Sequence, residues 1–379
     1  MLQIKRTDIF SYDLPKERIA DRPKRPFHDA KLLVCDMASK KLSESNFFNI
    51  TDFLSSKDMI VFNDTKVIPA RFFGVIETGA KVECLLIKKI NNNLWEALGK
   101  PFKKFKKGRL IKIDERLVFK TEEVLEDAKI LISFKEYSED EIWEKGIMPI
   151  PPYIRKGVSD SQDKVDYQTV FAKIAGSVAA PTASLHFTKE LLEKIDEKGI
   201  RKEFITLHVG TPSFLPLWKD NNNNNNDDDN NNDNENNNEN NNESNTKSNA
   251  ESDMNVSALP GEEFYIYSKD VIEKIGKVRK NGGKVVAVGT TVIRALESMA
   301  LEKNAVDGEF FSTSLFIAPG FKFQNVDVMV TNFHQPATSH ILLVQAFMGK
   351  DFLSSAYNYA LNNNFRFLSY GDGIIVGNI

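Results

Sequence analysis

Short apolar runs separated by polar turns dominate residues 67–150. Runs of this length, bounded by Gly, Asn or charged residues, are typical of β-strands. They are "ARFFGVIE", "KVECLLIKKI", "LWEALGK", "GRLIKI", "ERLVFK" and "KILISF". Several strands at such short spacing predict a small β-barrel. The Pro-rich stretch "MPIPPYIRKG" marks the end of this region.

Outside this region, apolar strands alternate with amphipathic helices. "DMIVFNDTK" predicts a strand that runs into a polar turn, and "TKELLEKIDEKG" predicts a helix with Thr188 as N-cap and Gly199 just beyond its end. The elements that follow are a strand "RKEFITLHVG", a helix "SKDVIEKIGKVRKNGG", a strand "KVVAVG", a helix "TTVIRALESMALE", a strand "VDVMVTNFH" and a helix "SHILLVQAFMGKDFLSSAYNYALNN". Such alternation predicts an α/β layered structure.

The pattern therefore predicts an α/β fold in which a small β-barrel domain is inserted into a main α/β layered domain. We expect residues 1–65 and 151–379 to form the discontinuous α/β domain and residues 66–150 to form the barrel. Residues 220–253 are nearly all Asn, Asp, Glu and Ser, so they cannot bury enough apolar surface to offset the entropy of ordering. We expect a disordered loop insertion there; a self-associating Asn-rich segment is the alternative.

Composition adds few restrictions. The formal net charge of −3 excludes neither nucleic acid nor other partners, because positive charge can be local. The two cysteines, Cys35 and Cys84, form no C-x-x-C pattern, and free thiols are expected. The charged N-terminal stretch lacks the apolar core of a signal peptide, and no run approaches 18 apolar residues. We expect a cytoplasmic protein without a membrane partner.

Polar residues follow the ends of several predicted strands. In open α/β sheets, ligands bind beyond the carboxyl ends of the strands, so these residues predict a shared cleft. They are Asn63, Asp64 and Thr65; His208 and Gly210; Gly289, Thr290 and Thr291; and Thr331, Asn332 and His334. The alternative for Thr290 or Thr291 is helix capping. No phosphate-binding loop pattern is present, which argues against a nucleoside triphosphate site.

Five histidines occur, and their spacing does not favour a metal site. No H-x-x-x-H pair exists, and His334 and His340 are six residues apart, the wrong spacing for one helical face. We therefore expect no metal and favour acid–base roles. His208 lies in an apolar strand and could instead be a hydrogen-bonded core residue. A surface ion pair is the simplest interpretation of Arg294 and Glu297.

The stretch "GKPFKKFKKGRLIK" is strongly basic and carries two phenylalanines. Lysines in such a stretch bind phosphates without reading sequence, so it suits a polyanion. A solvated hairpin is the alternative.

Ten motifs together resemble the S-adenosylmethionine:tRNA ribosyltransferase-isomerase family of queuosine biosynthesis. The resemblance covers nearly the whole chain except the Asn-rich insertion. The motifs are "YDLPKERIA" (12–20), "IVFNDTKVIPARFFG" (60–74), "GKPFKKFKKG" (99–108), "MPIPPYI" (148–154), "DYQTVFA" (166–172), "GSVAAPTASLHFT" (176–188), "TLHVG" (206–210), "VVAVGTTVIRALES" (285–298), "VTNFHQPATS" (330–339) and "FRFLSYGDGIIV" (365–376).

The resemblance implies a reaction. The ribosyl part of S-adenosylmethionine, a co-substrate, is transferred to 7-aminomethyl-7-deazaguanine at the wobble position of tRNA and is isomerised, giving epoxyqueuosine, adenine and methionine. It also implies an α/β domain paired with a β-barrel domain and no metal. We expect tRNA as the partner and a monomeric enzyme.

Motif membership and residue type supply the candidate site residues. The candidate acids and bases are His186, His208, His334, Asp64 and Asp372. The candidate substrate-binding residues are Arg71, Tyr167, Thr182, Gly210, Thr290, Thr291, Arg294, Asn332 and Tyr370, with Arg294 as a partner for the methionine carboxylate. The candidate tRNA-binding residues are Lys103, Lys104, Lys106 and Lys107. The small residues of "GSVAAPTASLHFT" would let the backbone approach a ligand closely.

The chain departs from the family pattern after residue 210. A His-x-Met-His-x-Glu element is expected there, but "NVSALPGEEFYIY" contains Glu262 and Glu263 and no histidine, and Glu263 could supply the acidic residue. "HQPATSH" (334–340) replaces the usual Leu-Pro-x-Ser-Thr-Leu continuation. An active enzyme is the leading hypothesis. The alternatives are a catalytically altered or inactive homologue that binds tRNA or S-adenosylmethionine, and an S-adenosylmethionine-using enzyme with another acceptor.

Overall fold

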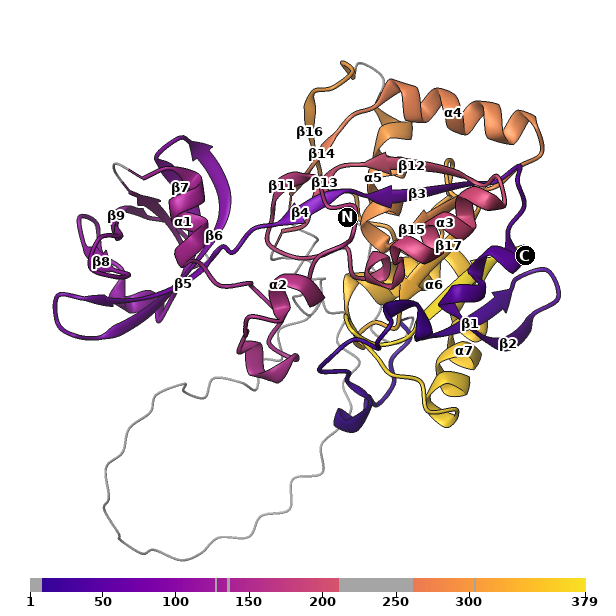
Figure 1. The fold of residues 1–379 in the computed structure, drawn as a ribbon, viewed down its shortest axis with the longest axis horizontal. Helices are drawn as coiled ribbons and strands as arrows, with labels where there is room; N and C mark the ends of the chain where they lie inside the picture. Colours follow the sequence, from indigo (N-terminus) through magenta and orange to yellow (C-terminus); the bar gives the residue numbers. More distant parts are fainter. Residues whose placement is uncertain (1–8, 127, 135–136, 211–261, 303–304) are drawn as a thin grey trace, which may run out of the picture.

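The computed structural model describes residues 9–126, 128–134, 137–210, 262–302 and 305–379. The Asn-rich insertion, residues 220–253, lies outside the described residues. The described part combines a seven-stranded mixed sheet with a closed six-stranded barrel, as Figure 1 shows. The predicted fold class, an α/β domain that carries a small inserted β-barrel, is therefore confirmed.

The seven-stranded sheet is parallel over its first four strands. Its order is β12 (Arg201–Ile205), β3 (Met59–Asn63), β15 (Val285–Val288), β17 (Val328–Asn332), β18 (Gly373–Gly377), β1 (Lys31–Asp36) and β2 (Lys41–Asn46). β18 runs antiparallel to β17, and β1 runs parallel to β18. As a result, the carboxyl ends of four strands and the starts of β18 and β1 meet at one edge.

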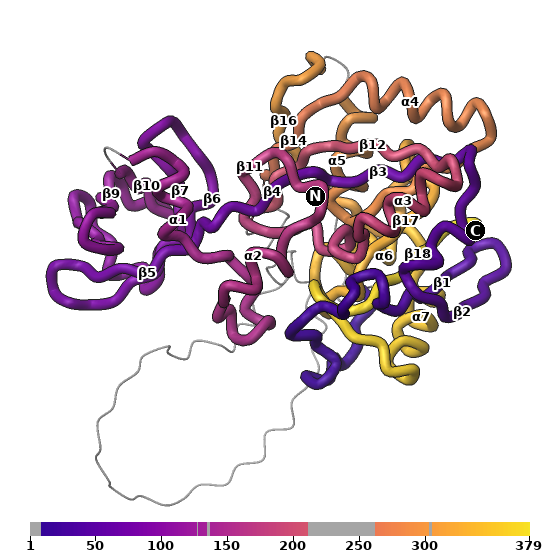
Figure 2. The backbone as a smooth tube through the Cα atoms, viewed as in Figure 1, coloured from indigo at the N-terminus to yellow at the C-terminus, as the bar shows by residue number. Residues whose placement is uncertain are grey.

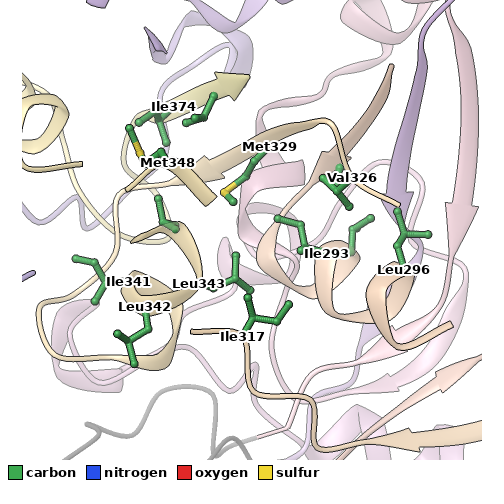
Figure 3. Close-up of a cluster of buried hydrophobic side chains, with 14 of the residues drawn as sticks. Ile293, Leu296, Ile317, Val326, Met329, Ile341, Leu342, Leu343, Met348 and Ile374 are labelled. Atoms are coloured by element: carbon green, nitrogen blue, oxygen red, sulfur yellow. The ribbon is translucent and has the colours of Figure 1, made fainter. Parts of the chain in front are cut away.

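Alternating side chains of the sheet pack against helices on both faces. Along β15, Val285 and Ala287 belong to one hydrophobic cluster, while Val286 and Val288 belong to the other. The first face is covered by α4 (Lys269–Lys280), α5 (Thr290–Leu301), α6 (Ser339–Met348) and α7 (Lys350–Asn362). The second face is covered by α3 (Lys189–Glu197) and the 3₁₀ helix η4 (Phe47–Phe53). Figure 3 shows the first cluster, where Ile293 of α5 and Leu343 of α6 lie near Met329 of β17.

Helix ends follow the predicted capping chemistry in one place and depart from the prediction in another. Thr188 caps α3 by accepting a hydrogen bond from the Leu191 N–H, and Gly199 follows the helix with φ of 71°. The single helix expected over 339–363 is wrong. Gly349, with φ of 83°, separates α6 from α7, because this backbone conformation cannot continue a helix.

The barrel consists of the six runs that the pattern identified. Its strands are β5 (Arg71–Ile76), β6 (Lys81–Asn91), β7 (Leu94–Lys100), β8 (Leu110–Lys112), β9 (Val118–Val124) and β10 (Lys129–Ser133). In Figure 2 the backbone passes to the barrel after β4 and returns through the segment that carries α2. The exact domain boundaries, at 65/66 and 150/151, stay a prediction.

Smaller elements lie between the barrel and the sheet. β4 (Thr65–Val67) pairs with β11 (Ile174–Ser177), and β13 (Leu207–His208), β14 (Glu263–Ile266) and β16 (Phe310–Thr313) form a three-stranded sheet. The single strand expected for "RKEFITLHVG" is therefore wrong: the chain leaves the large sheet after Ile205 and enters the small one at Leu207.

Short helices complete the described chain. They are α1 (Glu139–Lys145), α2 (Asp163–Asp166), η2 (Lys16–Arg18), η3 (Phe27–Asp29), η5 (Phe102–Lys104), η6 (Arg155–Gly157) and η7 (Thr182–His186). Of the helices that the structure describes, none is long and apolar enough to cross a membrane.

Candidate active site

A hollow of about 660 Å³, continuous with solvent, lies at the edge where the strand ends meet. We call it the sheet-edge cavity. Its polar lining comes from residues after β15 and β17, from η7 and from the segment before β18. The lining residues are Tyr153, Ala180, Pro181, Thr182, Ala183, Val209, Gly289, Thr290, Thr291, Thr331, Asn332, Phe333, His334, Gln335, Thr338, His340, Leu368 and Ser369. Two of the four predicted polar strand ends, those after β15 and β17, thus contribute to one cavity.

Hydrogen bonds fix the polar side chains of this cavity. Thr182 donates to the Asn332 side-chain oxygen over 2.8 Å, and the Asn332 amide nitrogen lies 3.3 Å from Nε2 of His186. Thr331 Oγ1 and Nε2 of His334 are 2.9 Å apart. Because Gly289 is the N-cap of α5 and has no side chain, Thr290 and Thr291 do not cap this helix; both line the cavity.

Two histidines lie together in the cavity wall. The rings of His334 and His340 are stacked, with centroids 5.1 Å apart, although six residues separate them in sequence. Loss of hydration lowers the pKa of His334 well below its ordinary value, and it lowers the pKa of His340 to about 4. Both rings are therefore neutral near pH 7.

His186, the histidine of "GSVAAPTASLHFT", does not line the cavity. Its side chain is buried and stacks on Phe47 with centroids 4.1 Å apart. Burial lowers its pKa to about 3. His186 therefore contacts Asn332, which lines the cavity, but does not itself line the cavity.

A second, larger hollow of about 1530 Å³ lies between the barrel and the three-stranded sheet. We call it the barrel cleft. Its lining combines aromatic rings, three lysines, three glutamates and one histidine. The residues are Ile68, Ile87, Lys88, Lys89, Trp95, Glu96, Lys129, Glu139, Trp143, Ala175, Gly176, His208, Val209, Gly210, Glu262, Phe264 and Phe310. Val209 lines both hollows, so the two meet at the segment after β13.

His208 is held at this cleft by three neighbours. Nδ1 of its ring lies 2.8 Å from Oγ1 of Thr65, and its ring stacks on Phe310 at 6.0 Å. Gly176 has φ of 146°, and a Cβ atom there would lie 2.8 Å from Nε2 of His208. The glycine that opens "GSVAAPTASLHFT" is therefore required by the imidazole 32 residues later. Burial lowers the pKa of His208.

Arg294 and Glu297 are both buried, so the expected surface ion pair between them is wrong. Arg294 pairs with Glu263 of β14 and donates from Nε to the Leu315 carbonyl over 3.1 Å. Glu297 accepts from the N–H groups of Gln324 and Asn325. Arg294 also lines a small recess beside the sheet-edge cavity, and Thr290 and His340 line both spaces.

The remaining predicted acids accept hydrogen bonds within the fold and line neither hollow. Asp64 accepts a 2.6 Å hydrogen bond from Thr206, and burial raises its pKa. Asp372 accepts from the N–H groups of Lys31 and Arg366, and burial raises its pKa as well.

The other predicted binding residues divide between the two hollows and their supports. Gly210 lines the barrel cleft. Arg71 pairs with Glu83 and donates to the Gly157 carbonyl, which ties the barrel to the segment after it. Tyr167 and Tyr370 are fully buried with ring centroids 6.1 Å apart, and the Tyr370 hydroxyl donates to Asp163.

The predicted tRNA-binding lysines, Lys103, Lys104, Lys106 and Lys107, are exposed on the loop between β7 and β8. Figure 1 shows β8 on the side of the barrel away from the large sheet. None of these four lysines lines the barrel cleft. Among the described residues, no group of three or more His, Cys, Asp or Glu side chains is placed to hold a metal ion.

Sequence reasoning missed several residues that shape these hollows. In the sequence, Thr65 stands out only as a polar residue at the end of a strand. The aromatic residues Trp95, Trp143 and Phe310 of the cleft follow the strand or helix pattern, and nothing in the sequence marks them as lining a site. His340 was considered only for a metal. These residues come together through long-range pairing, for which a single sequence gives no local signal.

Comparison with known proteins agrees with the architecture. A family model described as "Queuosine biosynthesis protein" matches residues 7–233 and 243–376. A protein from Halothermothrix orenii named S-adenosylmethionine:tRNA ribosyltransferase-isomerase is 39% identical over 376 residues, covering 98% of this chain and 99% of the relative. A Thermosipho melanesiensis protein of the same name is 38% identical over 97% of this chain and 98% of the relative.

A solved structure is also similar. The crystal structure of S-adenosylmethionine tRNA ribosyltransferase from Thermotoga maritima aligns with a TM-score of 0.50 and 30% sequence identity. The alignment covers 97% of this chain and 99% of the crystallised chain.

Proposed function

Because this chain belongs to the queuosine biosynthesis protein family, we propose that it is an S-adenosylmethionine:tRNA ribosyltransferase-isomerase. It transfers the ribosyl moiety of S-adenosylmethionine to 7-aminomethyl-7-deazaguanine at the wobble position of tRNA. The product is epoxyqueuosine, and adenine and methionine leave. We further propose that it works as a cytoplasmic monomer and that S-adenosylmethionine is its co-substrate, without a metal.

The observation that carries this proposal is the meeting of two hollows at Val209. A group transfer between a small molecule and a nucleic acid needs one site for each reactant, with the reacting atoms next to each other. The sheet-edge cavity is small and polar, and the barrel cleft is large and aromatic. Because Val209 lines both hollows, a reactant bound in one would lie next to a reactant bound in the other.

The sheet-edge cavity suits S-adenosylmethionine. Thr182, Thr290, Thr291 and Asn332 offer hydroxyl and amide groups for the ribose and the adenine edge. The first N–H groups of α5 follow Gly289, and a helix N-terminus favours an anion such as the methionine carboxylate. Arg294 remains a candidate for the same carboxylate, through the recess that it lines, although Glu263 already neutralises part of its charge.

Two histidines are best placed for proton transfer. The reaction needs a base for a proton beside the sulfonium and an acid for the departing adenine. His334 lines the sheet-edge cavity and His208 lines the barrel cleft. Both have lowered pKa values, so both are neutral bases near pH 7. We propose supporting roles for His186, Asp64 and Asp372, because none of the three lines either hollow.

The test is an assay of the purified full chain with S-adenosylmethionine and tRNA that carries 7-aminomethyl-7-deazaguanine. Mass spectrometry should detect adenine, methionine and epoxyqueuosine in equal amounts. S-adenosylhomocysteine without adenine would instead indicate methyl transfer and would contradict the proposal. Asn332→Ala should raise the KM for S-adenosylmethionine without changing the affinity for tRNA.

The competing function is a binding protein without turnover. The observation that favours it is the absence of histidine from "NVSALPGEEFYIY", where the family pattern has two. Tight binding of both S-adenosylmethionine and tRNA without any adenine release would establish that alternative.

A further inference from the structure

We propose that the barrel cleft is an acceptor-base site, in which one nucleobase, turned out of the anticodon loop, stacks between aromatic rings of the barrel and Phe310 of the three-stranded sheet. The proposal rests on the proposed function and specifies where its second reactant binds. The ligand class is a planar heteroaromatic base that bears a primary amine.

Aromatic side chains face the cleft from both walls. Trp95 and Trp143 come from the barrel and are packed edge to face, with centroids 5.4 Å apart. Phe264 and Phe310 come from β14 and β16. Base–aromatic stacking is the usual way in which proteins hold single nucleotides outside a helix. A cleft with rings on opposite walls is therefore suited to a flat base.

Phe310 is the most accessible of these rings. It is 58% exposed, yet one side of it stacks on His208. Its exposed area is available for a second planar partner, and that partner would lie beside the His208 imidazole.

Trp95 supplies an unused donor. Its side chain is only 5% exposed, and its indole N–H finds no hydrogen-bond partner among the described residues. A buried indole N–H normally has a partner, because leaving it without one is unfavourable. The exocyclic carbonyl of a guanine-like base is an acceptor of the right type for this donor.

The charges of the cleft match a nucleotide with an amine. Lys88, Lys89 and Lys129 each lie near a glutamate of the cleft: Glu262, Glu139 and Glu96, respectively. The lysines can bind the flanking phosphates, and the carboxylates attract a cationic aminomethyl group. Neutral His208 can take a proton from this ammonium group, which leaves an amine with a free lone pair in the cleft, next to the Val209 boundary.

The size of the cleft fits this role. Of the 1530 Å³, which includes the solvent at its mouth, about 550 Å³ lies within the cleft, and this exceeds what a single base fills. An enzyme that modifies a base must take it out of the stack, and this costs least in a single-stranded loop.

The experiment compares two anticodon stem-loop RNAs, one with 7-aminomethyl-7-deazaguanine at the wobble position and one abasic there. The full chain should bind the base-bearing RNA at least tenfold more tightly. Phe310→Ala should reduce this ratio about tenfold, because it removes the stacking surface. Trp95→Phe keeps a ring but removes the N–H and should reduce the ratio about threefold. Phe73→Ala is the matched control, because Phe73 is 51% exposed on the barrel but does not line the cleft.

A wild-type ratio near one, or ratios that stay at the wild-type value in both Phe310→Ala and Trp95→Phe, would overturn the proposal. Adenine release, measured on the same preparations, separates this outcome from failure of the proposed function. Turnover without base-dependent binding contradicts only the acceptor-base site. Base-dependent binding that both variants weaken, without turnover, contradicts only the enzymatic activity.

Discussion

At the scale of single residues, the contacts of His208 indicate that Thr65 orients its imidazole ring. Thr65 is fully buried at the start of β4, and its hydroxyl is 2.8 Å from Nδ1 of His208. This contact fixes which ring nitrogen faces the cleft, since the two nitrogens of a neutral imidazole have opposite hydrogen-bonding roles. Thr65 is thus a positioning residue in the proposed mechanism.

Thr65→Val should lower kcat about tenfold while the affinity for S-adenosylmethionine stays unchanged, because it removes one hydrogen bond from the base and nothing from the sheet-edge cavity. Because His208 must be neutral to act, kcat/KM should fall as pH falls through its lowered pKa, and the variant should shift the midpoint of this fall. Initial rates between pH 5 and 8 would measure it. Thr65→Ser keeps the hydroxyl and should restore both kcat and the pH midpoint of kcat/KM. If Thr65→Ser is as impaired as Thr65→Val, the loss comes from altered side-chain packing and not from the lost hydrogen bond.

His340 allows a prediction about acid stability. Its pKa is lowered to about 4 from an ordinary value near 6.5, so the folded protein resists protonation there and the unfolded chain does not. Stability from this group is therefore full above pH 6.5 and is lost as pH falls from 6.5 to 4, by at most ~3 kcal/mol.

His340→Leu, which introduces the residue of the family pattern, should flatten the fall in unfolding free energy between pH 6.5 and 4. Urea unfolding at several pH values would measure the slope. His28→Leu is a suitable control, because His28 lies away from both hollows beside Thr188. An equal slope in the wild type and His340→Leu would contradict this account.

At the scale of elements, what the sequence could predict depended on whether the information was local. Each barrel strand shows its own alternation of apolar and polar residues. Thr188 accepts a hydrogen bond from the Leu191 N–H, only three residues further on. Both the strands and the start of α3 could therefore be predicted. The division between α6 and α7 was not, because apolar residues continue on both sides of Gly349. The contact of Thr65 with His208 spans 143 residues, and the cleft joins separate sheets. Such contacts depend on strand order, which periodicity alone does not specify.

A buried ion pair between Glu263 and Arg294 links β14 to α5. Its side chains are only 1% and 9% exposed, so removing one charge leaves the other buried without a counter-ion. Glu263→Gln should therefore lower the unfolding free energy by about 3 to 5 kcal/mol. Chemical denaturation at pH 7 would measure it.

The control for this prediction is Asp196→Asn. Asp196 pairs with Lys202 but is 59% exposed, and solvent-exposed pairs contribute little, so unfolding should be nearly unchanged. If Glu263→Gln were equally harmless, the ion pair would not stabilise the junction of β14 and α5.

At the scale of the whole molecule, the proposed function assigns separate tasks in tRNA recognition to the two hollows and the basic loop. The sheet-edge cavity and the barrel cleft meet at Val209, while Lys103, Lys104, Lys106 and Lys107 lie on the loop between β7 and β8, outside both hollows. A tRNA is long enough to reach both. Under the proposed function, selecting the base is the task of the cleft and positioning the backbone is the task of the lysines, because phosphate contacts carry no sequence information.

Replacing these four lysines with glutamine should weaken tRNA binding by a similar factor for base-bearing and abasic RNA. The slope of log affinity against log salt should decrease by about 3, since each lost phosphate contact removes about 0.7 to 0.9. Affinities measured between 50 and 300 mM salt test this. The control replaces three exposed lysines of α4, Lys269, Lys277 and Lys280, which lie on the large sheet away from the barrel. Equal salt slopes for wild type and the barrel variant would mean that the tRNA does not cross the barrel, and the backbone contacts would then have to come from the cleft lysines alone.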